Sequence, residues 1–333
     1  MRALFIFFIF AMHSLFAFSL KDKFFEAEEG TYIVTEQNQM ISLLHLHSKE
    51  ENRLIFEEIS IPHHKGKNLK WKEWAEKGAP GCTSWIFYEV DLESEKVTEC
   101  YSFIRKAFLS TEEMSAFLVP LMTLHLNYLS EEKRLQTGPA AKPGQVGNRP
   151  WGPPQFFEGK KVIEPSYDVY TAKWPVDKSE LSGKPIVLYF DKERKTFPFP
   201  YWMQVREGAI KFKMRALDSG SDLKSFQDKM PRRAPAFTSG VQKEGHHLTL
   251  MLNCPTYYKE LKIYAVDMTQ PPHITHLVPF SEVRSGESVT LLIDQKIANE
   301  QFTPGHEYVW IIASESYKMA LESPFRMVHS ADK

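Results

Sequence analysis

Hydrophobic and polar residues alternate in short runs along much of this chain, a pattern that favours β-strands over helices. In the first part of the chain these runs are separated by short polar stretches, which is typical of antiparallel hairpins. Ser84–Asp91 (SWIFYEVD) is apolar on both faces, so it predicts a central strand that is covered on both sides. The strands predicted in this part are Thr31–Gln37, Met40–Ser48, Arg53–Pro62, Ser84–Asp91 and Lys96–Arg105.

Two segments of the first part follow a helical period instead. Asn68 is a suitable N-cap and Gly78 a suitable stop, so a short helix is predicted near 68–77. Trp71 and Trp74 would lie on one face of it. Apolar residues recur at helical spacing between 111 and 129, which predicts a second helix. That helix is too apolar to stand in water, so we expect it to pack on a sheet.

The segment 138–154 (GPAAKPGQVGNRPWGPP) holds four glycines and five prolines and interrupts the pattern. More strands follow it, and four strands alone would leave one face of a sheet open to water. We therefore expect them to join the first five in one large curved antiparallel sheet or open barrel, with the apolar helix on its concave face. The β-rich domain predicted in this way spans 20–230, and 138–154 is a long surface loop within it. The later strands are Asp168–Trp174, Pro185–Asp191, Pro200–Glu207 and Ile210–Leu217.

A second break, Met230–Gly240 (MPRRAPAFTSG), precedes short strand-like runs at the spacing of a β-sandwich. In this last segment of the chain, residues 302–313 (FTPGHEYVWIIA) resemble the corner that enters the penultimate strand of fibronectin type III domains. There a hydrophobic residue and Pro-Gly precede a tyrosine, here Tyr308, whose hydroxyl ties back to the turn. The resemblance implies an immunoglobulin-like β-sandwich over 240–330 and no chemistry. We recognise no family in the rest of the chain.

The N-terminus has the composition of a signal peptide. Met1-Arg2 is followed by the mostly apolar run Ala3–Phe18, which is shorter than the ~20 residues of a membrane span. Small residues stand at the −3 and −1 positions of a cleavage after Ser19. Residues 1–19 therefore predict an exported protein of the periplasm, the cell envelope or the secreted fraction. The alternative is a protein anchored by an uncleaved N-terminal helix.

Export changes the interpretation of the cysteines. In an oxidising compartment a disulfide between Cys82 and Cys100 is one option, and Cys254 would then be left over. The two residues flank one predicted hairpin but are several residues out of register. The alternative is that all three are small buried hydrophobic residues.

Charge and motif content exclude several classes of function. Lys+Arg number 41 and Asp+Glu 42, for a formal net charge of −1, so no basic excess indicates nucleic-acid binding. The sequence has no GxSxG, HExxH, GxGxxG or phosphate-binding GK[ST] motif. We therefore predict no cofactor, and a non-enzymatic protein is favoured over an enzyme.

One fragment keeps an enzymatic alternative open. Ala216–Ser221 (ALDSGS) resembles the aspartic-protease loop, in which two hydrophobic residues precede Asp-Ser-Gly, and it makes Asp218 the catalytic candidate. That chemistry requires two carboxylates that share a proton, so a single copy would demand a homodimer. The other interpretation is a polar turn, because Asp, Ser and Gly are common turn residues.

His45 and His47 are the candidates for metal binding. They alternate, so both point to one face of a strand. If that strand turns back near residue 50, His45 faces about Ile55, and no third ligand comes close. Without a third ligand, histidines on the surface or rim are the alternative.

The remaining candidates are aromatic. Trp71 and Trp74 could form a surface that touches a ligand or partner, or they could seal the end of the sheet. Trp151 in the Pro/Gly-rich loop is the third such residue. The function predicted is an exported, non-enzymatic binding or envelope-associated protein whose partner is a lipid, a peptide or another envelope protein. The alternative is an exported hydrolase with Asp218 as its catalytic residue.

Overall fold

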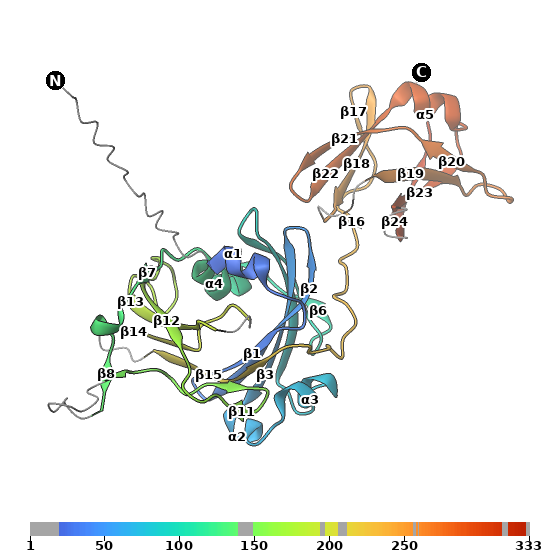
Figure 1. Cartoon of the computed structure of the whole chain (residues 1–333). Helices are drawn as coiled ribbons and strands as arrows, with labels where there is room; N and C mark the ends of the chain where they lie inside the picture. The colour runs from blue at the N-terminus through green and yellow to red at the C-terminus, as the bar shows by residue number, and fades with distance from the viewer. Residues whose placement is uncertain are drawn as a thin grey trace, which may run out of the picture. The chain divides into compact units, whose positions relative to one another are not determined.

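The chain divides into two compact β-rich units, Met1–Pro231 (unit 1) and Arg232–Lys333 (unit 2) (Figure 1). The structure, a computed structural model, describes residues 20–138, 149–193, 197–205, 212–255, 258, 260–314 and 319–330. The predicted signal peptide, residues 1–19, lies outside the described residues. The same holds for 139–148, the middle of the Pro/Gly-rich segment.

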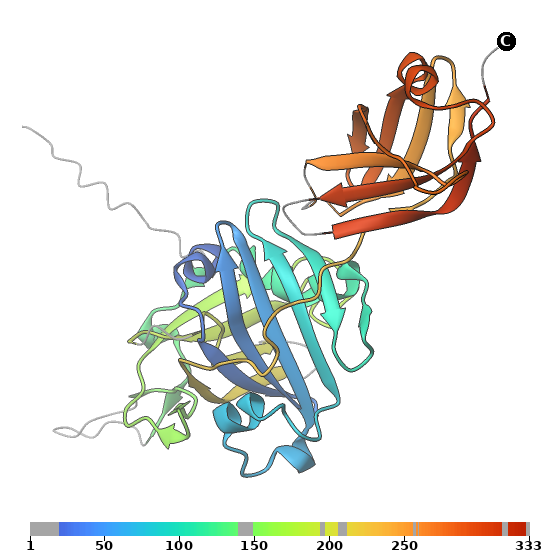
Figure 2. The same cartoon turned by 90° about the vertical axis from the view of Figure 1, so that its right-hand side faces the viewer.

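Unit 1 is built on one eleven-stranded antiparallel sheet. Its order is β6-β5-β4-β3-β2-β1-β15-β14-β13-β12-β7, so strands from both sides of the Pro/Gly-rich segment share it. Figure 2 shows β2, β3 and β4 running side by side. From one edge to the other the strands are β6 (Ala107–Phe108), β5 (Lys96–Ser102), β4 (Ser84–Asp91), β3 (Arg53–Pro62), β2 (Met40–Glu50), β1 (Tyr32–Gln37), β15 (Lys213–Gly220), β14 (Trp202–Val205), β13 (Pro185–Asp191), β12 (Tyr167–Lys173) and β7 (Asn127–Tyr128).

The predicted fold class of unit 1, a large curved antiparallel sheet with a packed apolar helix, is confirmed. Among the described strands the sheet is open, because β6 and β7 stand at its two ends. None of the helices in the described part of the chain is long and apolar enough to cross a bilayer.

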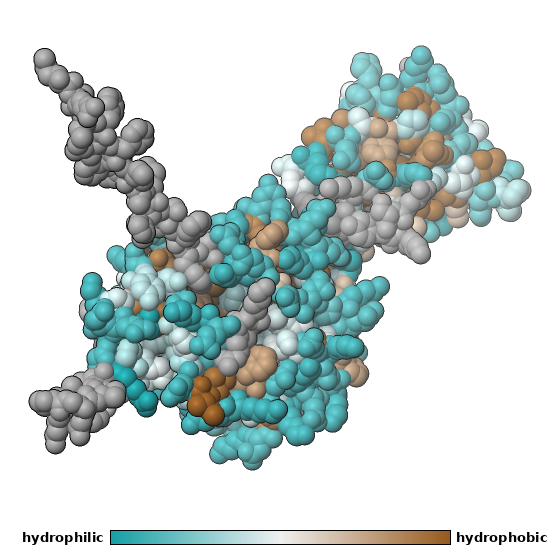
Figure 3. Space-filling view, in the orientation of Figure 1, coloured by the Kyte–Doolittle hydropathy of each residue, from teal (hydrophilic) through white to brown (hydrophobic). Residues whose placement is uncertain are grey.

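Both faces of the sheet are buried, as the two-sided apolar pattern of β4 predicts. One face, here called the α4 face, carries Ile33, Leu44, Phe56 and Tyr88 and belongs to one hydrophobic core. The other, here called the α3 face, carries Val34, Leu43, Ile59 and Phe87 and belongs to a second core. Because side chains alternate along a strand, neighbouring residues of β1 to β4 enter different cores. The surface seen in Figure 3 is correspondingly mostly hydrophilic.

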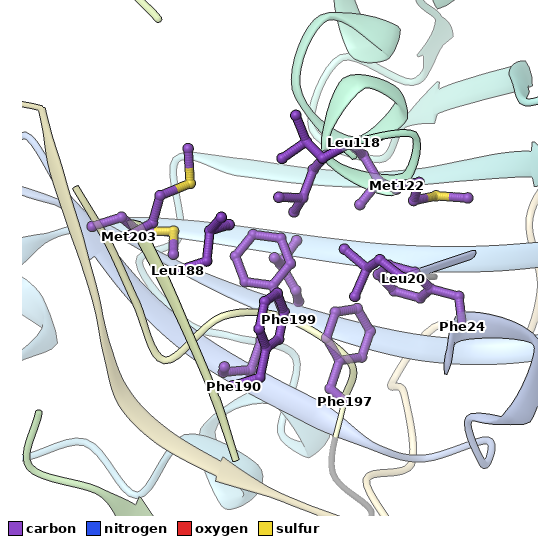
Figure 4. Close-up of a cluster of buried hydrophobic side chains, with 14 of the residues drawn as sticks. Leu20, Phe24, Leu118, Met122, Leu188, Phe190, Phe197, Phe199 and Met203 are labelled. Atoms are coloured by element: carbon purple, nitrogen blue, oxygen red, sulfur yellow. The ribbon is translucent and has the colours of Figure 1, made fainter. Parts of the chain in front are cut away.

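Short helices cover both faces. Leu20 and Phe24 from α1, and Leu118 and Met122 from α4, pack into the core of the α4 face (Figure 4). Trp71 and Trp74 from α3 pack into the core of the α3 face. The helices of unit 1 are α1 (Leu20–Glu26), α2 (His63–Gly66), α3 (Trp71–Glu76), α4 (Thr111–Met122) and the 3₁₀ helix η1 (Glu131–Lys133).

Helix α4 is shorter than the predicted 111–129. It continues through Pro120 but ends at Met122. Asn127 and Tyr128 instead form β7, which pairs with Thr171 and Tyr170 of β12. A strand partner that is distant in the sequence therefore ends the helical pattern.

Two small hairpins complete unit 1. In the second of them, Glu158 and Gly159 adopt positive φ angles of 50° and 74° in a tight turn that Gly tolerates well. The hairpins are β8 (Gln136–Thr137) with β9 (Arg149–Pro150), and β10 (Phe156–Phe157) with β11 (Lys160–Lys161).

Unit 2 consists of two antiparallel sheets around one hydrophobic core. Leu250 and Leu291 from one sheet and Ile263 and Trp310 from the other are each 0% exposed in this core. One sheet has the order β16-β18-β22-β21, with β17 also paired to β18, and the other has the order β20-β19-β23-β24. The elements are β16 (Ala236–Phe237), β17 (Gln242–Glu244), β18 (His247–Asn253), β19 (Leu261–Asp267), β20 (Thr275–Val278), β21 (Ser281–Ser285), β22 (Ser288–Asp294), α5 (Gln295–Gln301), β23 (Glu307–Ser314) and β24 (Met319–Val328).

Tyr308 at the start of β23 closes the turn before it. Its side chain is fully buried, and its hydroxyl accepts a hydrogen bond from the N–H of Thr303 at 2.8 Å. This is the tie between tyrosine and turn that the sequence predicted at this corner.

Replacing Tyr308 by Phe tests this tie. The change removes the acceptor of the Thr303 N–H at a partly buried corner, so we expect unit 2 to lose about 0.5–1.5 kcal/mol of unfolding free energy in urea titrations. Tyr264→Phe on β19 is the matched control, because the Tyr264 side chain is half-buried and makes no hydrogen bond among the described residues. Equal losses from both variants would contradict the role of the corner.

Candidate ligand cavity on the α4 face

A cavity of about 370 Å³ lies on the α4 face of the sheet, under helix α4. It has an apolar side and a polar side. The apolar side is formed by Met40, Leu44, Phe117, Leu118, Phe199 and Met214. The polar side is formed by Thr35, Gln37, Asn38, Ser42, Glu58 and Tyr88.

Strand register places the polar side chains together. Ser42 of β2 stands opposite Thr35 of β1 and Ser60 of β3, and Leu44 stands opposite Glu58. Cross-strand neighbours on one face lie within side-chain contact of each other. The hydroxyls of Ser42 and Ser60 are 2.8 Å apart, and the Ser60 hydroxyl donates to Oε1 of Glu58 at 3.5 Å.

Glu58 is the charged group of this cavity. Protein surrounds its carboxyl except where the cavity reaches it. Burial raises the pKa of Glu58, and hydrogen bonds from Ser42 and Ser60 oppose that shift only in part. No ion pair with Glu58 occurs among the described residues, so no described cation balances the carboxyl.

The apolar side is built from separate segments. Figure 4 shows Leu118 and Met122 pointing down from α4 towards Phe199, with Phe197, Leu20 and Phe24 beside it. Phe117 stacks on Trp174 at a centroid distance of 5.5 Å and lies 6.1 Å from Phe199. These rings hold the apolar wall in place opposite Glu58.

Cysteine chemistry is not a feature of this site. Cys82, Cys100 and Cys254 are free thiols, so the disulfide considered from the sequence is not formed. Cys100 pairs with Tyr88 on the α4 face, whereas Cys82 lies before β4 and packs against the core of the α3 face. The sheet thus separates the two side chains. Burial raises the pKa of the Cys100 thiol to about 12, which keeps it unreactive.

The predicted histidine pair lies on the opposite face, the α3 face. The rings of His45 and His47 are 6.0 Å apart, so they do share a face. His45 stands opposite Glu57 and not Ile55, because the turn between β2 and β3 lies at Glu51 and Asn52 and not at residue 50. A bulge between Leu46 and Ser48 also changes the register by one residue. Within the described ranges no cluster of three or more His, Cys, Asp or Glu could hold a metal ion.

His45 is instead part of a buried polar network around Glu57. Its Nδ1 lies 2.8 Å from Oε2 of Glu57, and both side chains are at most 2% exposed. Oε1 of Glu57 accepts hydrogen bonds from Trp85 Nε1 at 2.8 Å and from the Ser225 hydroxyl at 2.7 Å. Nε2 of His47 lies 3.1 Å from the carbonyl oxygen of Gln227. The network therefore fixes the segment that leads out of unit 1.

Asp218 lies in a strand and not in a turn. It is a residue of β15, 5% exposed, and its Oδ1 accepts a hydrogen bond from the N–H of Gly159 at 3.0 Å. Among the described residues no carboxyl group hydrogen-bonds to it. The described residues therefore hold no carboxyl pair that shares a proton, as aspartic-protease chemistry needs.

The tryptophans proposed as a contact surface are mostly packed. Trp71 and Trp74 share a helix face as predicted, meet edge to face at 5.7 Å, and are 8% and 5% exposed. Trp151 meets Tyr189 and Trp202 edge to face, at 5.3 and 5.0 Å. Trp71 and Asp218 nonetheless line one groove on the α3 face.

No sequence motif marks Glu57 or Glu58 as functional residues. The available signal was two adjacent carboxylates inside the apolar strand Arg53–Pro62 (RLIFEEISIP). Charged residues are rarely buried without a partner. Glu57 and Glu58 lie on opposite faces of the sheet, and distant segments of the chain cover each face. The sequence of the strand alone therefore does not predict their different surroundings.

Comparisons with known proteins find similarity to CT021 proteins. A family model described as CT021 protein matches residues 42–163. A solved structure of the hypothetical protein CT021 from Chlamydia trachomatis is 14% identical, with a TM-score of 0.48, and the match covers 65% of this chain and 98% of that chain. No curated protein matches this chain.

The two adjacent carboxyls allow a paired test of stability. Glu57→Gln puts an amide where three donors converge, so we expect a loss of ~3 kcal/mol or more in urea unfolding. Glu58→Gln removes a carboxyl whose ionisation is penalised by burial, so its stability should equal or exceed that of the wild type.

The effect of Glu58 has a defined pH dependence. Because its pKa in the folded protein is raised above the ordinary 4.5, the wild type loses stability relative to Glu58→Gln as pH rises from about 4.5 through the raised pKa. Unfolding titrations across this range measure the difference. A difference that is constant with pH would refute the burial of an ionisable Glu58.

Proposed function

We propose that this protein is an exported, non-enzymatic binding protein that holds a small amphipathic molecule in the cavity of unit 1. The observation that carries this proposal is the cavity itself. A curved sheet with an apolar helix over it could have been packed solid, but about 370 Å³ remains between Glu58 and the apolar wall. Ligand sites of proteins are commonly apolar cavities of this order with a few placed polar groups.

The lining favours a particular ligand chemistry. The apolar side suits a hydrocarbon body, and Glu58 with the neighbouring hydroxyls suits one hydrogen-bonding head group. An ammonium or hydroxyl head group can donate to Glu58, whereas a carboxylate head group would be repelled by the ionised form. A small lipid-like amine or alcohol therefore fits better than a fatty acid.

The geometry around Glu58 supports binding over catalysis. A nucleophile needs a base within hydrogen-bonding reach and a group that orients that base. Near Glu58 the described partners are two serine hydroxyls, and none of the described residues that line the cavity is a histidine or lysine. For the alternative of a hydrolase with Asp218 as its catalytic residue, no carboxyl among the described residues hydrogen-bonds to Asp218.

Unit 2 supports a docking or spacing role. We assign it to the immunoglobulin-like sandwiches, with the corner of fibronectin type III domains. The support is the strand order, in which β16, β18, β22 and β21 correspond to A-B-E-D, and β19, β23 and β24 to C-F-G. The hydrogen bond between Tyr308 and Thr303 adds to it. Export rests on residues 1–19, which have the pattern of a signal peptide.

Ligand retention tests the proposal. Native mass spectrometry of the exported protein should show an extra small-molecule mass that is lost on denaturation. Leu118→Trp fills the cavity and should abolish that mass, whereas Glu50→Gln, at an exposed end of β2, should leave it unchanged.

A defined set of probes tests the chemistry. Octylammonium and octanol should bind, and octanoate should bind at least tenfold more weakly near neutral pH. Glu58→Gln should weaken octylammonium binding about tenfold, since one charge-assisted hydrogen bond contributes ~1.5–3 kcal/mol. Equal binding of the three probes, unaffected by Glu58→Gln, would refute the cavity as the site.

A further inference from the structure

A second hollow lies on the α3 face of unit 1, on the opposite side of the sheet from the cavity. It is a groove of about 940 Å³ between helix α3 and the hairpin β10–β11, here called the α3 groove. The proposed function does not use it. Its residues include Tyr32, Trp71, Phe156, Glu158 and Asp218.

Strand pairing brings Tyr32 and Asp218 together on the floor of the groove. Tyr32 stands opposite Gly220, and Asp218 stands opposite Val34, so the two side chains are diagonal neighbours on one face. The phenol ring lies over Gly220, where a Cβ atom would be 2.6 Å from the Tyr32 hydroxyl oxygen. Gly220 is therefore required for this position of the ring.

The polar atoms of this floor are not fully satisfied. Tyr32 is 1% exposed, and its hydroxyl has no hydrogen-bond partner within the described part of the chain. Asp218 is 5% exposed, and its described partners are the backbone N–H groups of Gly159, at 3.0 Å on Oδ1, and of Ser219. No described cation pairs with Asp218. Burying a polar group or a carboxyl without a partner costs free energy. A ligand that supplies the missing hydrogen-bond partners therefore binds more favourably.

The charge at the floor is negative. Burial raises the pKa of Tyr32, and Asp218, Glu158 and Glu76 raise it further. Glu158 at the hairpin tip is exposed and forms no ion pair among the described residues.

The nearby lysines do not neutralise this floor. Nζ of Lys70 donates to Glu73 at 2.9 Å, and Nζ of Lys72 donates to the Ser221 carbonyl at 2.9 Å. Lys160 is exposed on the hairpin. Tyr32, Asp218 and Glu158 thus remain as acceptors.

We propose that the α3 groove binds a primary ammonium group on an apolar stem, as found in a lysine side chain or a free alkylamine. An ammonium has three N–H donors, which match the Asp218 carboxylate, the Glu158 carboxylate and the Tyr32 hydroxyl oxygen. Trp71, Phe156 and Leu217 supply aromatic and apolar surface for the stem. The described residues contain no cluster that could hold a metal ion, which favours an organic cation.

Binding should depend on pH. Burial raises the pKa of Asp218, while the Gly159 N–H opposes the shift. Because the ammonium pairs with the ionised carboxylate, its affinity should increase as pH rises through this pKa. The titratable or charged groups that line the groove around Asp218 are Tyr32 from β1, Glu158 and Lys160 from the hairpin, and Lys70, Lys72, Glu73 and Glu76 from α3.

Calorimetric titration of the full-length protein tests the proposal with three probes. They are n-butylammonium, Nα-acetyl-lysine methylamide and the uncharged Nα-acetyl-norleucine methylamide. We expect both amines to bind and the norleucine compound not to bind. Tighter binding of the lysine compound would identify a protein or peptide as the source of the ammonium, and equal binding would identify a free amine.

Variants locate the site. Asp218→Asn keeps an acceptor for Gly159 and should weaken binding at least tenfold. Glu158→Gln, on the exposed hairpin tip where folding is not at risk, should weaken it about threefold to tenfold. Tyr32→Phe should weaken it about threefold. The control is Glu93→Gln, in the exposed β4–β5 turn.

Failure of both amines to bind, or binding that Asp218→Asn and Glu158→Gln leave unchanged, would overturn the proposal. Tyr32 and Asp218 would then serve only to hold the hairpin and the core. Glu58→Gln should not affect ammonium binding in the α3 groove. Failure of the proposal for the groove can therefore be distinguished from failure of the proposal for the cavity.

Discussion

The fold of unit 1 depends on the buried carboxylate of Glu57. Its oxygens are hydrogen-bonded to His45 of β2, Trp85 of β4 and Ser225 of the segment after β15. A carboxylate at this depth is tolerated only when it is fully hydrogen-bonded, so these partners cannot move independently. The network sets the register of the central strands and fixes where the chain leaves unit 1. The cavity on the α4 face and the α3 groove are both lined by strands held in this register.

Glu58 shows how the pleat of one strand separates two roles. It follows Glu57 directly, yet alternation turns it to the α4 face, where two serine hydroxyls and a cavity meet it. Three donors satisfy one carboxyl, and the other has no cation among the described residues. Two adjacent glutamates thus have different roles: Glu57 stabilises the fold on one face, and Glu58 offers a binding group on the other. The difference arises from what covers each face.

Local patterns predicted the strands well and the contacts between distant segments poorly. Arg53–Pro62, Ser84–Asp91 and Pro185–Asp191 begin and end where alternation and turn residues place them. The helix from Thr111 ends early because Asn127 and Tyr128 pair with β12, a partner more than forty positions away. The turn after β2 lies at Glu51 and Asn52, and a bulge near His47 shifts the register by one residue, so His45 faces Glu57 and not Ile55. The cavity could not be predicted, because Phe199 and Met214 reach it only through the folded sheet.

Asp218 illustrates why the local sequence was ambiguous there. Asp-Ser-Gly is compatible with a turn or with a catalytic loop, and both interpretations assume that neighbouring residues decide its surroundings. Pairing with β1 decides them instead. A bulge between Val34 and Thr35 leaves Ala216 with the α4 core and Asp218 beside Tyr32 on the other face. The regular pairing of Asp218, Ser219 and Gly220 with β1 therefore excludes a turn. Because it also places Asp218 on the same face as Tyr32, it gives the α3 groove its acidic floor.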